Sequence, residues 1–321
     1  MGSPLLEVKN LKVGFDTERG QILAVDGVDF SLEPGEVLGI AGESGCGKSV
    51  TALSIMQLLP HPVARILDGE IVYGGRNLLA LSPGEMQEIR GKKISMIFQE
   101  PMTALNPVHS VGKQMGEVYS LHFPAMSDVR GACIAMLEKV GIPDPGAVMG
   151  KYPHQLSGGM RQRVMIAMAL ACEPDILIAD EPTTALDVTV QAQILELIRS
   201  LQKENGMSLI LITHDMGVIA QNCQNVMVMY AGAMAEFGPT IPLFDTPSHP
   251  YTQGLLAAIP SKSDTIKSIL PTIRGNVPSL LELPKGCRFA DRCPKFESIC
   301  ATAPPPEKRI GETHKARCYL L

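Results

Sequence analysis

The chain has 321 residues, of which 45% are hydrophobic, and its 28 basic and 33 acidic residues give a net charge of −5. This length suffices for one large domain with an appendage, and the charge balance argues against nucleic acid or an anionic membrane surface as the main partner. The first residues lack the basic and long apolar segments of a secretion signal, and no apolar run approaches the ~20 residues of a spanning helix. We therefore expect a cytosolic protein, held at a membrane only by another chain.

Residues 5–15 and 22–32 alternate or cluster apolar side chains in the manner of strands, with turn residues at Asp26-Gly27 and Pro34-Gly35. We predict two antiparallel strands that lie beside the glycine-rich turn that follows them. Phe15, near the end of the first strand, could stack on an adenine ring, but an aromatic residue in a strand more often belongs to the core. The residues by themselves favour the core.

An apolar stretch, residues 37–41, leads into residues 42–49, which fit the pattern G-x-x-x-x-G-K-[ST]. A strand, a glycine turn and a helix opening at Lys48 place backbone N–H groups around an anion, with the helix N-terminus aimed at it. Lys48 would bring its charge to the β- and γ-phosphates of a nucleotide, and the Ser49 hydroxyl can be a Mg²⁺ ligand. The alternative is a chance glycine turn, which the flanking strand and the apolar helix after it make less favoured.

Residues 94–99 form an apolar strand that ends on Gln99, and a proline-bounded loop follows at residues 100–107. A polar side chain in this position can reach a metal or an attacking water, or it can simply cap the strand, and the residues leave both readings open. Residues 111–150 have helical periodicity with breaks marked by proline and glycine. We expect a helical insert suited to interaction with another protein.

A further helix opens within residues 156–163. Ser157 is a good N-cap, and Gly158 and Gly159 leave the helix N-terminus open to close approach, which suits a second anion-binding helix end. The alternative is an ordinary capped helix, and out of context a Ser-Gly-Gly sequence favours that reading.

Residues 175–181 read as a short apolar strand, buried on both faces, that ends in Asp180 and Glu181. Adjacent strand residues point to opposite faces, so one carboxylate can hold Mg²⁺ while the other faces the γ-phosphate and polarises a water. Helix capping is the alternative, but the proline directly after them leaves the pair on a loop. The next buried strand, residues 207–212, leads to His214, which is either structural or placed where open α/β sheets bind ligands.

The chain contains eight cysteines. Four are scattered singly through periodic segments and indicate reduced thiols in a cytosolic fold, namely Cys46, Cys133, Cys172 and Cys223. The other four lie in a proline-rich tail that begins near Pro239 and contains a linker-like stretch at residues 261–275, namely Cys287, Cys293, Cys300 and Cys318. A small segment with few apolar residues needs a stabilising cross-link, which four thiolates can supply by binding a metal. Because no C-x-x-C pair is present, zinc (with His314 as a further ligand candidate), an iron–sulfur cluster and no metal all remain open.

Six motifs in one order resemble those of the ATP-binding subunit of ABC transporters, over about residues 6–238. They are residues 42–49, Gln99, residues 156–159, residues 176–181, residues 185–187 and His214. The resemblance implies an α/β fold of the ABC-type P-loop ATPases: a RecA-like core with an antiparallel β subdomain and a helical subdomain at about residues 100–172. We expect the ATPase domain to span residues 1–238 and a small Cys-rich C-terminal extension to span residues 239–321.

The resemblance also implies a role for each matching residue. It makes Glu181 the general base, His214 the residue that steadies the γ-phosphate and the water, and Gln99 the sensor of Mg²⁺ and of the permease. Asp180 would support Mg²⁺, and Ser49 and Gln99 would be its ligands. The implied nucleotide contacts, with Phe15 on the adenine ring, are Phe15, Gly42, Glu43, Ser44, Gly45, Cys46, Gly47, Lys48, Ser49, Val50, Ser157, Gly158, Gly159, Asp180 and Asp187.

In this family ATP is hydrolysed between two subunits, and the helix end at residues 157–159 of one subunit closes on the γ-phosphate held by the other. The chain has no second G-x-x-x-x-G-K-[ST] motif, so a second ATPase chain, either a homologous chain or another copy, must complete the two sites. Met160 departs from the commonest form of the signature, which has Gln there. Any contact that this Gln makes in the family is therefore not expected for Met160.

A narrower resemblance rests on residues 98–107, 152–160 and 249–252, which look like the ATPase subunits of bacterial dipeptide and oligopeptide importers, in which Met160 is usual. It implies ATP-driven peptide import with Mg²⁺, two transmembrane permease subunits and, indirectly, a peptide-binding protein, and no nucleic acid. It places the chain peripherally on the cytoplasmic face of the cell membrane. It also implies a [4Fe–4S] cluster on the four tail cysteines, Cys287, Cys293, Cys300 and Cys318, with zinc as the alternative.

Three other functions are weighed against peptide import. The same type of ATPase could energise import of nickel or another small solute. Binding assays on the partner binding protein would distinguish this function from peptide import. A non-transport ABC protein acting on DNA or ribosomes would predict a long coiled coil or two ATPase cassettes in one chain, and the sequence has neither. A tail cluster could also regulate the ATPase by its redox state.

Overall fold

The computed structural model describes residues 3–99, 104–184, 186–259 and 271–321. They divide into two compact units: unit 1, residues 1–79 and 211–321, and unit 2, residues 80–210. Three sequence expectations lie wholly or partly outside the described residues: the start of the loop at residues 100–107, Ala185 of the motif at residues 185–187, and most of the linker at residues 261–275.

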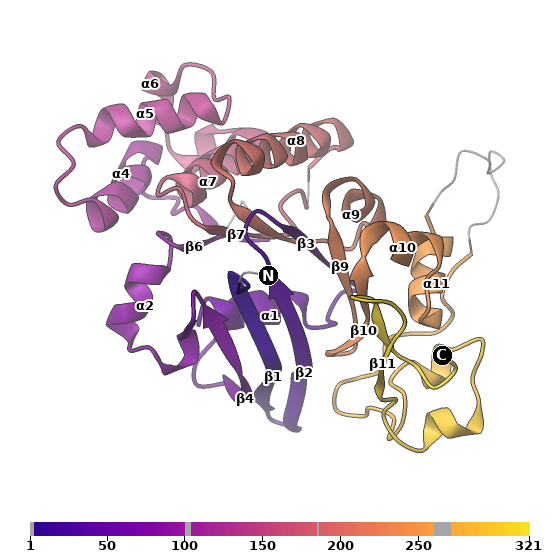
Figure 1. Ribbon diagram of the computed structural model, residues 1–321. Coiled ribbons are helices and arrows are strands. Elements are labelled where there is room, and N and C mark those ends of the chain that lie inside the picture. The colour runs from indigo at the N-terminus through magenta and orange to yellow at the C-terminus, as the bar shows by residue number, and fades with distance from the viewer. Residues whose placement is uncertain (1–2, 100–103, 185, 260–270) are drawn as a thin grey trace. The chain divides into compact units, whose positions relative to one another are not determined.

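The first sheet of unit 1 is antiparallel, with the strand order β2-β1-β4-β5 (Figure 1). Its strands are β1 (Leu6–Thr17), β2 (Gly20–Leu32), β4 (Ala64–Tyr73) and β5 (Arg76–Asn77). The register sets Leu6 opposite Leu32 and Phe15 opposite Ile22. Alternate side chains of β1 are buried where the sequence alternates, as expected for a sheet with one covered face. The predicted antiparallel strands are confirmed.

Unit 1 also contains the strands in the order β11-β12-β10-β9-β3. Their bounds are β3 (Val37–Ala41), β9 (Asn225–Tyr230), β10 (Ala233–Pro239), β11 (Glu307–Arg309) and β12 (Lys315–Arg317). The apolar strand β3 is buried along its whole length and pairs in parallel with β9. The helices of the unit are α1 (Lys48–Ile55), α9 (Met216–Asn222), α10 (Thr240–Asp245) and α11 (Pro250–Ala257).

The C-terminal tail is joined to this second set of strands. Strand β12 pairs with β10, with Glu236 opposite Ala316, and β11 pairs with β12. Between these strands and α11 the tail contains only the short 3₁₀ turns η3 (Ala290–Arg292) and η4 (Ser298–Ala301) among its described helical segments. Phe289 supplies an apolar anchor: its ring meets that of Tyr230 edge-on, with centroids 5.2 Å apart.

Unit 2 is mostly helical. Its elements are η1 (Leu78–Ala80, shared with unit 1), α2 (Pro83–Ile89), β6 (Ile94–Ile97), α4 (Val111–His122), α5 (Val129–Lys139), α6 (Pro145–Val148), η2 (Pro153–Gln155), α7 (Gly158–Leu170), β7 (Ile176–Asp180) and α8 (Val188–Asn205). The chain passes into unit 1 within β8 (Ser208–Ile212). Strands β6 and β7 pair in parallel, with Ile94 opposite Ile176. The helical insert expected at residues 111–150 is present as α4, α5 and α6.

The glycine turn after β3 needs its glycines for two different reasons. Gly42 has φ 147°, and a Cβ there would lie 2.2 Å from the Met229 carbonyl oxygen. Gly45 also has a positive φ, 77°, but a Cβ there would meet nothing within 4 Å. The first glycine is therefore required by both conformation and space, whereas the second is required by conformation alone.

We predict that Gly42→Ala lowers the free energy of unfolding by about 3 kcal/mol or more, because strain and a backbone clash combine, and that Gly45→Ala lowers it by only about 1–2 kcal/mol. Urea unfolding of both variants without nucleotide measures this difference. Equal losses would show that the contact with Met229 does not constrain the turn.

Candidate functional site

The turn at residues 42–47 holds Lys48 in a buried position at the start of α1. The lysine is only 5% exposed, and its Nζ donates hydrogen bonds to the carbonyl oxygens of Gly42 at 2.8 Å and Glu43 at 3.1 Å. At a helix N-terminus, a positive charge adds to that of the helix dipole instead of offsetting it. The turn therefore concentrates positive potential, which suits an anionic ligand.

Backbone hydrogen bonds fix the shape of this turn from outside. The Gly232 N–H donates to the Cys46 carbonyl at 3.0 Å, and the Glu43 N–H donates to the Tyr251 hydroxyl at 2.9 Å. Cys46 is buried in the turn, and burial raises the pKa of its thiol, so the neutral form is favoured there. The turn is thus held by α11 and by the segment after β9, both far away in sequence.

Two other predicted site residues lie in unit 1. Phe15 is half-buried on β1, opposite Ile22, so one part of its ring belongs to the sheet and another part is accessible. His214 is exposed, one residue before Asp215, whose carboxylate caps α9 by accepting from the Gly217 N–H at 2.8 Å. Both positions leave the side chain accessible to a ligand.

The two predicted carboxylates lie at the end of β7 in unit 2. Asp180 is 3% exposed, whereas Glu181 is half-buried and has φ 45°, a left-handed conformation that few non-glycine residues adopt. The Thr184 N–H donates to the Glu181 carbonyl at 3.1 Å and closes a turn there. A strained backbone of this kind persists where the surroundings enforce it, often at functional positions.

Glu181 and Gln99 meet in the structure. The Oε2 atom of Glu181 accepts from the Gln99 Nε2 at 3.2 Å and from the Thr184 Oγ1 at 2.8 Å. The sequence predicted Gln99 and Glu181 separately and gave Thr184 no role. The signal for Thr184 was local: a threonine three residues after an acid, just past a proline, can close a turn and return its hydroxyl to that acid.

The N-terminus of α7 is exposed, as an anion-binding helix end requires. Ser157 caps the helix by accepting from the Met160 N–H at 3.3 Å, which confirms the predicted N-cap, and Gly158 beside it is exposed. Asp187, a predicted nucleotide contact, caps α8 by accepting from the N–H groups of Thr189 at 3.1 Å and Val190 at 3.0 Å. In this structure its carboxylate therefore has a structural partner.

The four tail cysteines line one small pocket of unit 1. They are Cys287, Cys293, Cys300 and Cys318. Burial, with the neighbouring thiols adding to it, raises the pKa of Cys287 to about 11. Within the described ranges, however, no group of three or more His, Cys, Asp or Glu residues is arranged to hold a metal ion, so the structure does not support the predicted cluster. His314, the further zinc-ligand candidate, instead pairs through Nε2 with the buried Glu236 at 2.8 Å.

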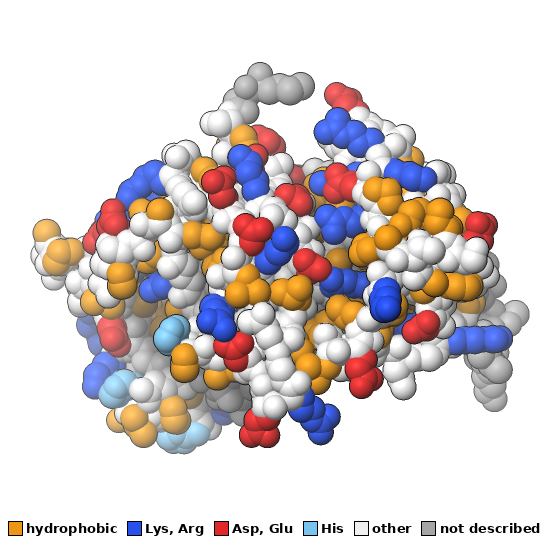
Figure 2. Space-filling model, turned by 90° about the horizontal axis from the view of Figure 1, so that it is seen from below, with side chains coloured by type: hydrophobic (Ala, Val, Ile, Leu, Met, Phe, Trp, Pro, Cys, Tyr) orange, Lys and Arg blue, Asp and Glu red, His pale blue; other side chains and the backbone are white. Residues whose placement is uncertain are grey.

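One face of the surface shows the distribution of charged side chains. On the face shown in Figure 2, basic and acidic side chains are interspersed and do not gather by sign. Among the described residues, no helix combines the length and the apolar character needed to cross a bilayer.

Family models match most of the chain. The model described as "ABC transporter" matches residues 25–184, and the model described as "Oligopeptide/dipeptide transporter, C-terminal region" matches residues 235–300. A third model, for an AAA domain, matches residues 152–220. The first match includes the glycine turn, the start of α7 and the carboxylates at the end of β7, and the second includes three of the four tail cysteines.

Individual proteins match over nearly the full length. The dipeptide transport ATP-binding protein DppD of Bacillus subtilis (strain 168) is 52% identical over 317 residues, 98% of this chain and 94% of that protein. A Sinorhizobium fredii protein named as a probable peptide ABC transporter ATP-binding protein, y4tR, is 50% identical over 98% of this chain and 94% of its own length. Among solved structures, the dimeric ATP-binding cassette MJ0796 bound to ADP and Pi has a TM-score of 0.66 and 28% identity, over 73% of this chain and 98% of that one. This chain therefore belongs to the family of ATP-binding proteins of peptide ABC transporters.

Proposed function

We propose that this chain is the ATP-hydrolysing subunit that energises import of dipeptides or oligopeptides through a membrane permease. The observation that carries the hydrolytic part is the Glu181 carboxylate, one oxygen of which is held by Gln99 at 3.2 Å and by Thr184 at 2.8 Å. The peptide part rests on the relatives, which are named for dipeptide and peptide transport. As proposed, residues 1–238 form the ATPase domain and residues 239–321 its extension.

The triphosphate would bind on the turn of residues 42–49. Its backbone N–H groups and Lys48 fit an anion, because the lysine ammonium is already held over the turn by the carbonyls of Gly42 and Glu43. Ser49 and Gln99 would hold Mg²⁺, with Asp180 in support, and the ion would neutralise charge on the phosphate oxygens. Phe15 would receive the adenine ring.

Hydrolysis would follow from the position of Glu181. Its carboxylate takes a proton from water as the water oxygen bonds to the γ-phosphorus and the bond from that phosphorus to the bridging oxygen breaks, which leaves ADP and phosphate. Gln99 and Thr184 orient the carboxylate before the reaction, and His214 would steady the γ-phosphate. The exposed α7 end at residues 157–159 of a second ATPase chain would close the site, and Asp187 would join it if released from its capping role.

We predict that Glu181→Gln retains ATP binding but lowers ATP turnover by about 100-fold or more, because the amide cannot accept the proton. Steady-state phosphate release and equilibrium ATP binding measure the two quantities. Glu138→Gln, at an exposed carboxylate on α5, is the matched control and should turn over normally. Near-normal hydrolysis by Glu181→Gln would refute the assignment.

A groove of about 340 Å³ in unit 2 is a suitable docking place for the permease. It is lined by apolar residues of several elements, including Phe98, Leu105, Leu121, Met165 and Met168. Phe98 directly precedes Gln99, so an occupant of the groove would contact the strand end that carries this glutamine. We propose that a cytoplasmic segment of each permease subunit binds here and holds the chain at the cytoplasmic face of the membrane.

Affinity purification of this chain from membranes should recover two permease proteins and a second ATPase chain. We expect Leu121→Asp to lose the permeases while keeping ATPase activity, because Leu121 is 71% exposed and a charge there disturbs the groove without entering the core. Ile241→Asp, at a residue 74% exposed in unit 1, is the matched control and should still recover them. Nickel binding and no peptide binding by the partner binding protein would favour the rival function.

We also propose that the four tail cysteines hold a [4Fe–4S] cluster, with zinc as the alternative. Support comes from the donor set, because four thiols line one pocket and thiolates are the usual ligands of such clusters. The cluster or zinc ion would cross-link and stabilise a segment with few apolar residues. His314 takes no part in this proposal, since it is engaged by Glu236.

Protein purified without oxygen should be brown and contain about four iron atoms per chain. Cys287→Ala should remove the colour and lower the thermal stability of the tail, while ATP binding persists. A colourless wild-type protein with one zinc would select the alternative, and a protein free of both metals would refute a metal site.

A further inference from the structure

A tail residue, Arg292, forms an ion pair with the phosphate-binding turn. Its Nη1 lies 2.7 Å from Oε2 of Glu43 and its Nη2 lies 3.0 Å from Oε1, so the pair is bidentate. The arginine side chain is 5% exposed and the glutamate side chain 30% exposed. A bidentate pair this well covered fixes the carboxylate in direction as well as in charge.

The tail holds Arg292 in place. Its Nε donates to the Arg274 carbonyl at 3.0 Å, its Nη1 also donates to the Tyr230 hydroxyl at 3.3 Å, and its guanidinium lies 6.0 Å from the Phe289 ring centroid. An arginine guanidinium stays charged in proteins. The guanidinium is therefore positioned before any ligand arrives.

Glu43 is a junction between the tail and Lys48. Its backbone N–H donates to the Tyr251 hydroxyl at 2.9 Å, its backbone carbonyl accepts from the Lys48 Nζ at 3.1 Å, and its carboxylate is held by Arg292. Any movement of Glu43 therefore moves an acceptor of the lysine that would contact the phosphates.

We propose that Arg292 is a positioning residue for nucleotide binding: it neutralises the Glu43 carboxylate and fixes its direction, so that ATP affinity depends on the tail. The proposal rests on the function proposed for the turn. It adds a role for residues 271–321 that does not depend on whether the cysteines bind a metal.

The charge of Glu43 explains why loss of Arg292 should weaken ATP binding. Glu43 lies within the turn, and an unpaired carboxylate there would repel a triphosphate and compete with it for Lys48, well within the ~8 Å over which salt fails to screen charges fully. Arg292 removes this penalty by supplying a fixed countercharge.

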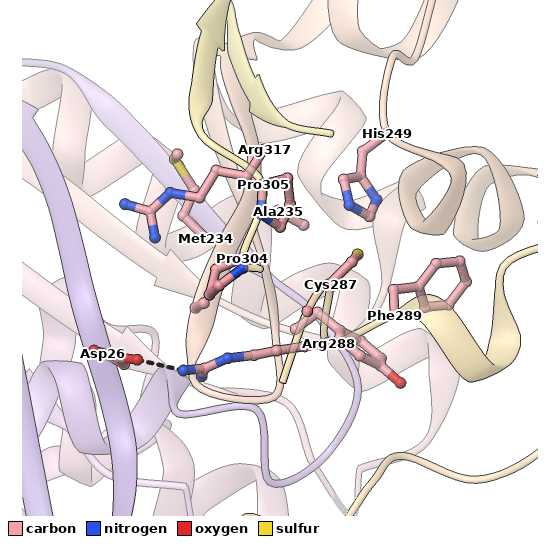
Figure 3. A pocket seen from close by; sticks show the side chains of 13 residues that line it. Asp26, Met234, Ala235, His249, Cys287, Arg288, Phe289, Pro304, Pro305 and Arg317 are labelled. Atoms are coloured by element: carbon pink, nitrogen blue, oxygen red, sulfur yellow. Dashed lines mark hydrogen bonds and ion pairs between the residues drawn. The ribbon is translucent and has the colours of Figure 1, made fainter. Parts of the chain in front are cut away.

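A second pair of the same tail provides a control. Arg288 forms an ion pair with Asp26 on β2, as Figure 3 shows, and also donates to the Ala231 carbonyl. Both pairs join the tail to the rest of unit 1, and Arg288 does not contact Glu43 by any hydrogen bond or ion pair that the structure shows. Loss of Arg288 therefore tests general damage to the tail.

The experiment is calorimetric titration of the full-length chain with ATP and Mg²⁺. We expect Arg292→Gln to raise the dissociation constant about tenfold, as for loss of one partner of a covered charge pair. The double variant Glu43→Gln/Arg292→Gln should return to within about threefold of wild type, because the repelling charge is gone. Arg288→Gln should stay within about twofold while lowering the melting temperature.

Several outcomes would overturn the proposal: unchanged affinity in Arg292→Gln, no recovery in the double variant, or an equal loss in Arg288→Gln, which would make the effect a general consequence of tail damage. If Arg292→Gln does not fold, Arg292→Lys replaces it and should bind ATP about threefold more weakly than wild type, whereas unchanged binding would count against the proposal. Failure of the proposed function is distinct, because the wild-type chain would then bind no ATP at all.

Discussion

The buried ammonium of Lys48 is the interaction on which the rest of the molecule depends. A lysine that is 5% exposed must be compensated, and here two carbonyl oxygens of its own turn do so, one of them from Glu43. Two carbonyl dipoles compensate a full charge only partly, and the N-terminus of α1 adds further positive potential. The turn is therefore stabilised when an anion binds, and the surrounding structure holds the turn in its anion-binding conformation.

Features that depend on local chemistry could be predicted from the sequence. The glycine turn, the buried strand ending in Asp180 and the N-cap at Ser157 are specified by residues within a few positions of one another, and the structure has them where the pattern placed them. The breaks in the helical insert could also be predicted from the sequence, because proline cannot continue a helix. The unit 1 strands β1 and β2 followed from alternation of apolar residues.

Pairings between distant residues could not be predicted in this way. Gln99 and Glu181 are 82 positions apart, and Arg292 and Glu43 are 249 apart, so no periodicity links them and only the folded chain shows which acid each residue meets. The tail cysteines are a different case, because their proximity could be predicted but their arrangement could not. Their number suggested a shared site, and they do share a pocket, but in the described residues they are not placed as a set of metal ligands, since ligand geometry is not encoded in spacing.

The tail belongs to the same compact unit as the phosphate-binding turn. Strand β12 extends the pairing of β10, Phe289 packs on Tyr230, and Tyr230 in turn contacts Tyr251, whose hydroxyl accepts from the backbone of Glu43. Each step is a direct contact, so the aromatic side chains form a continuous packed path from the tail to the turn. Because packed interiors are stiff, this path keeps the tail and the turn in a fixed relation, on which the bidentate pair of Arg292 and Glu43 depends.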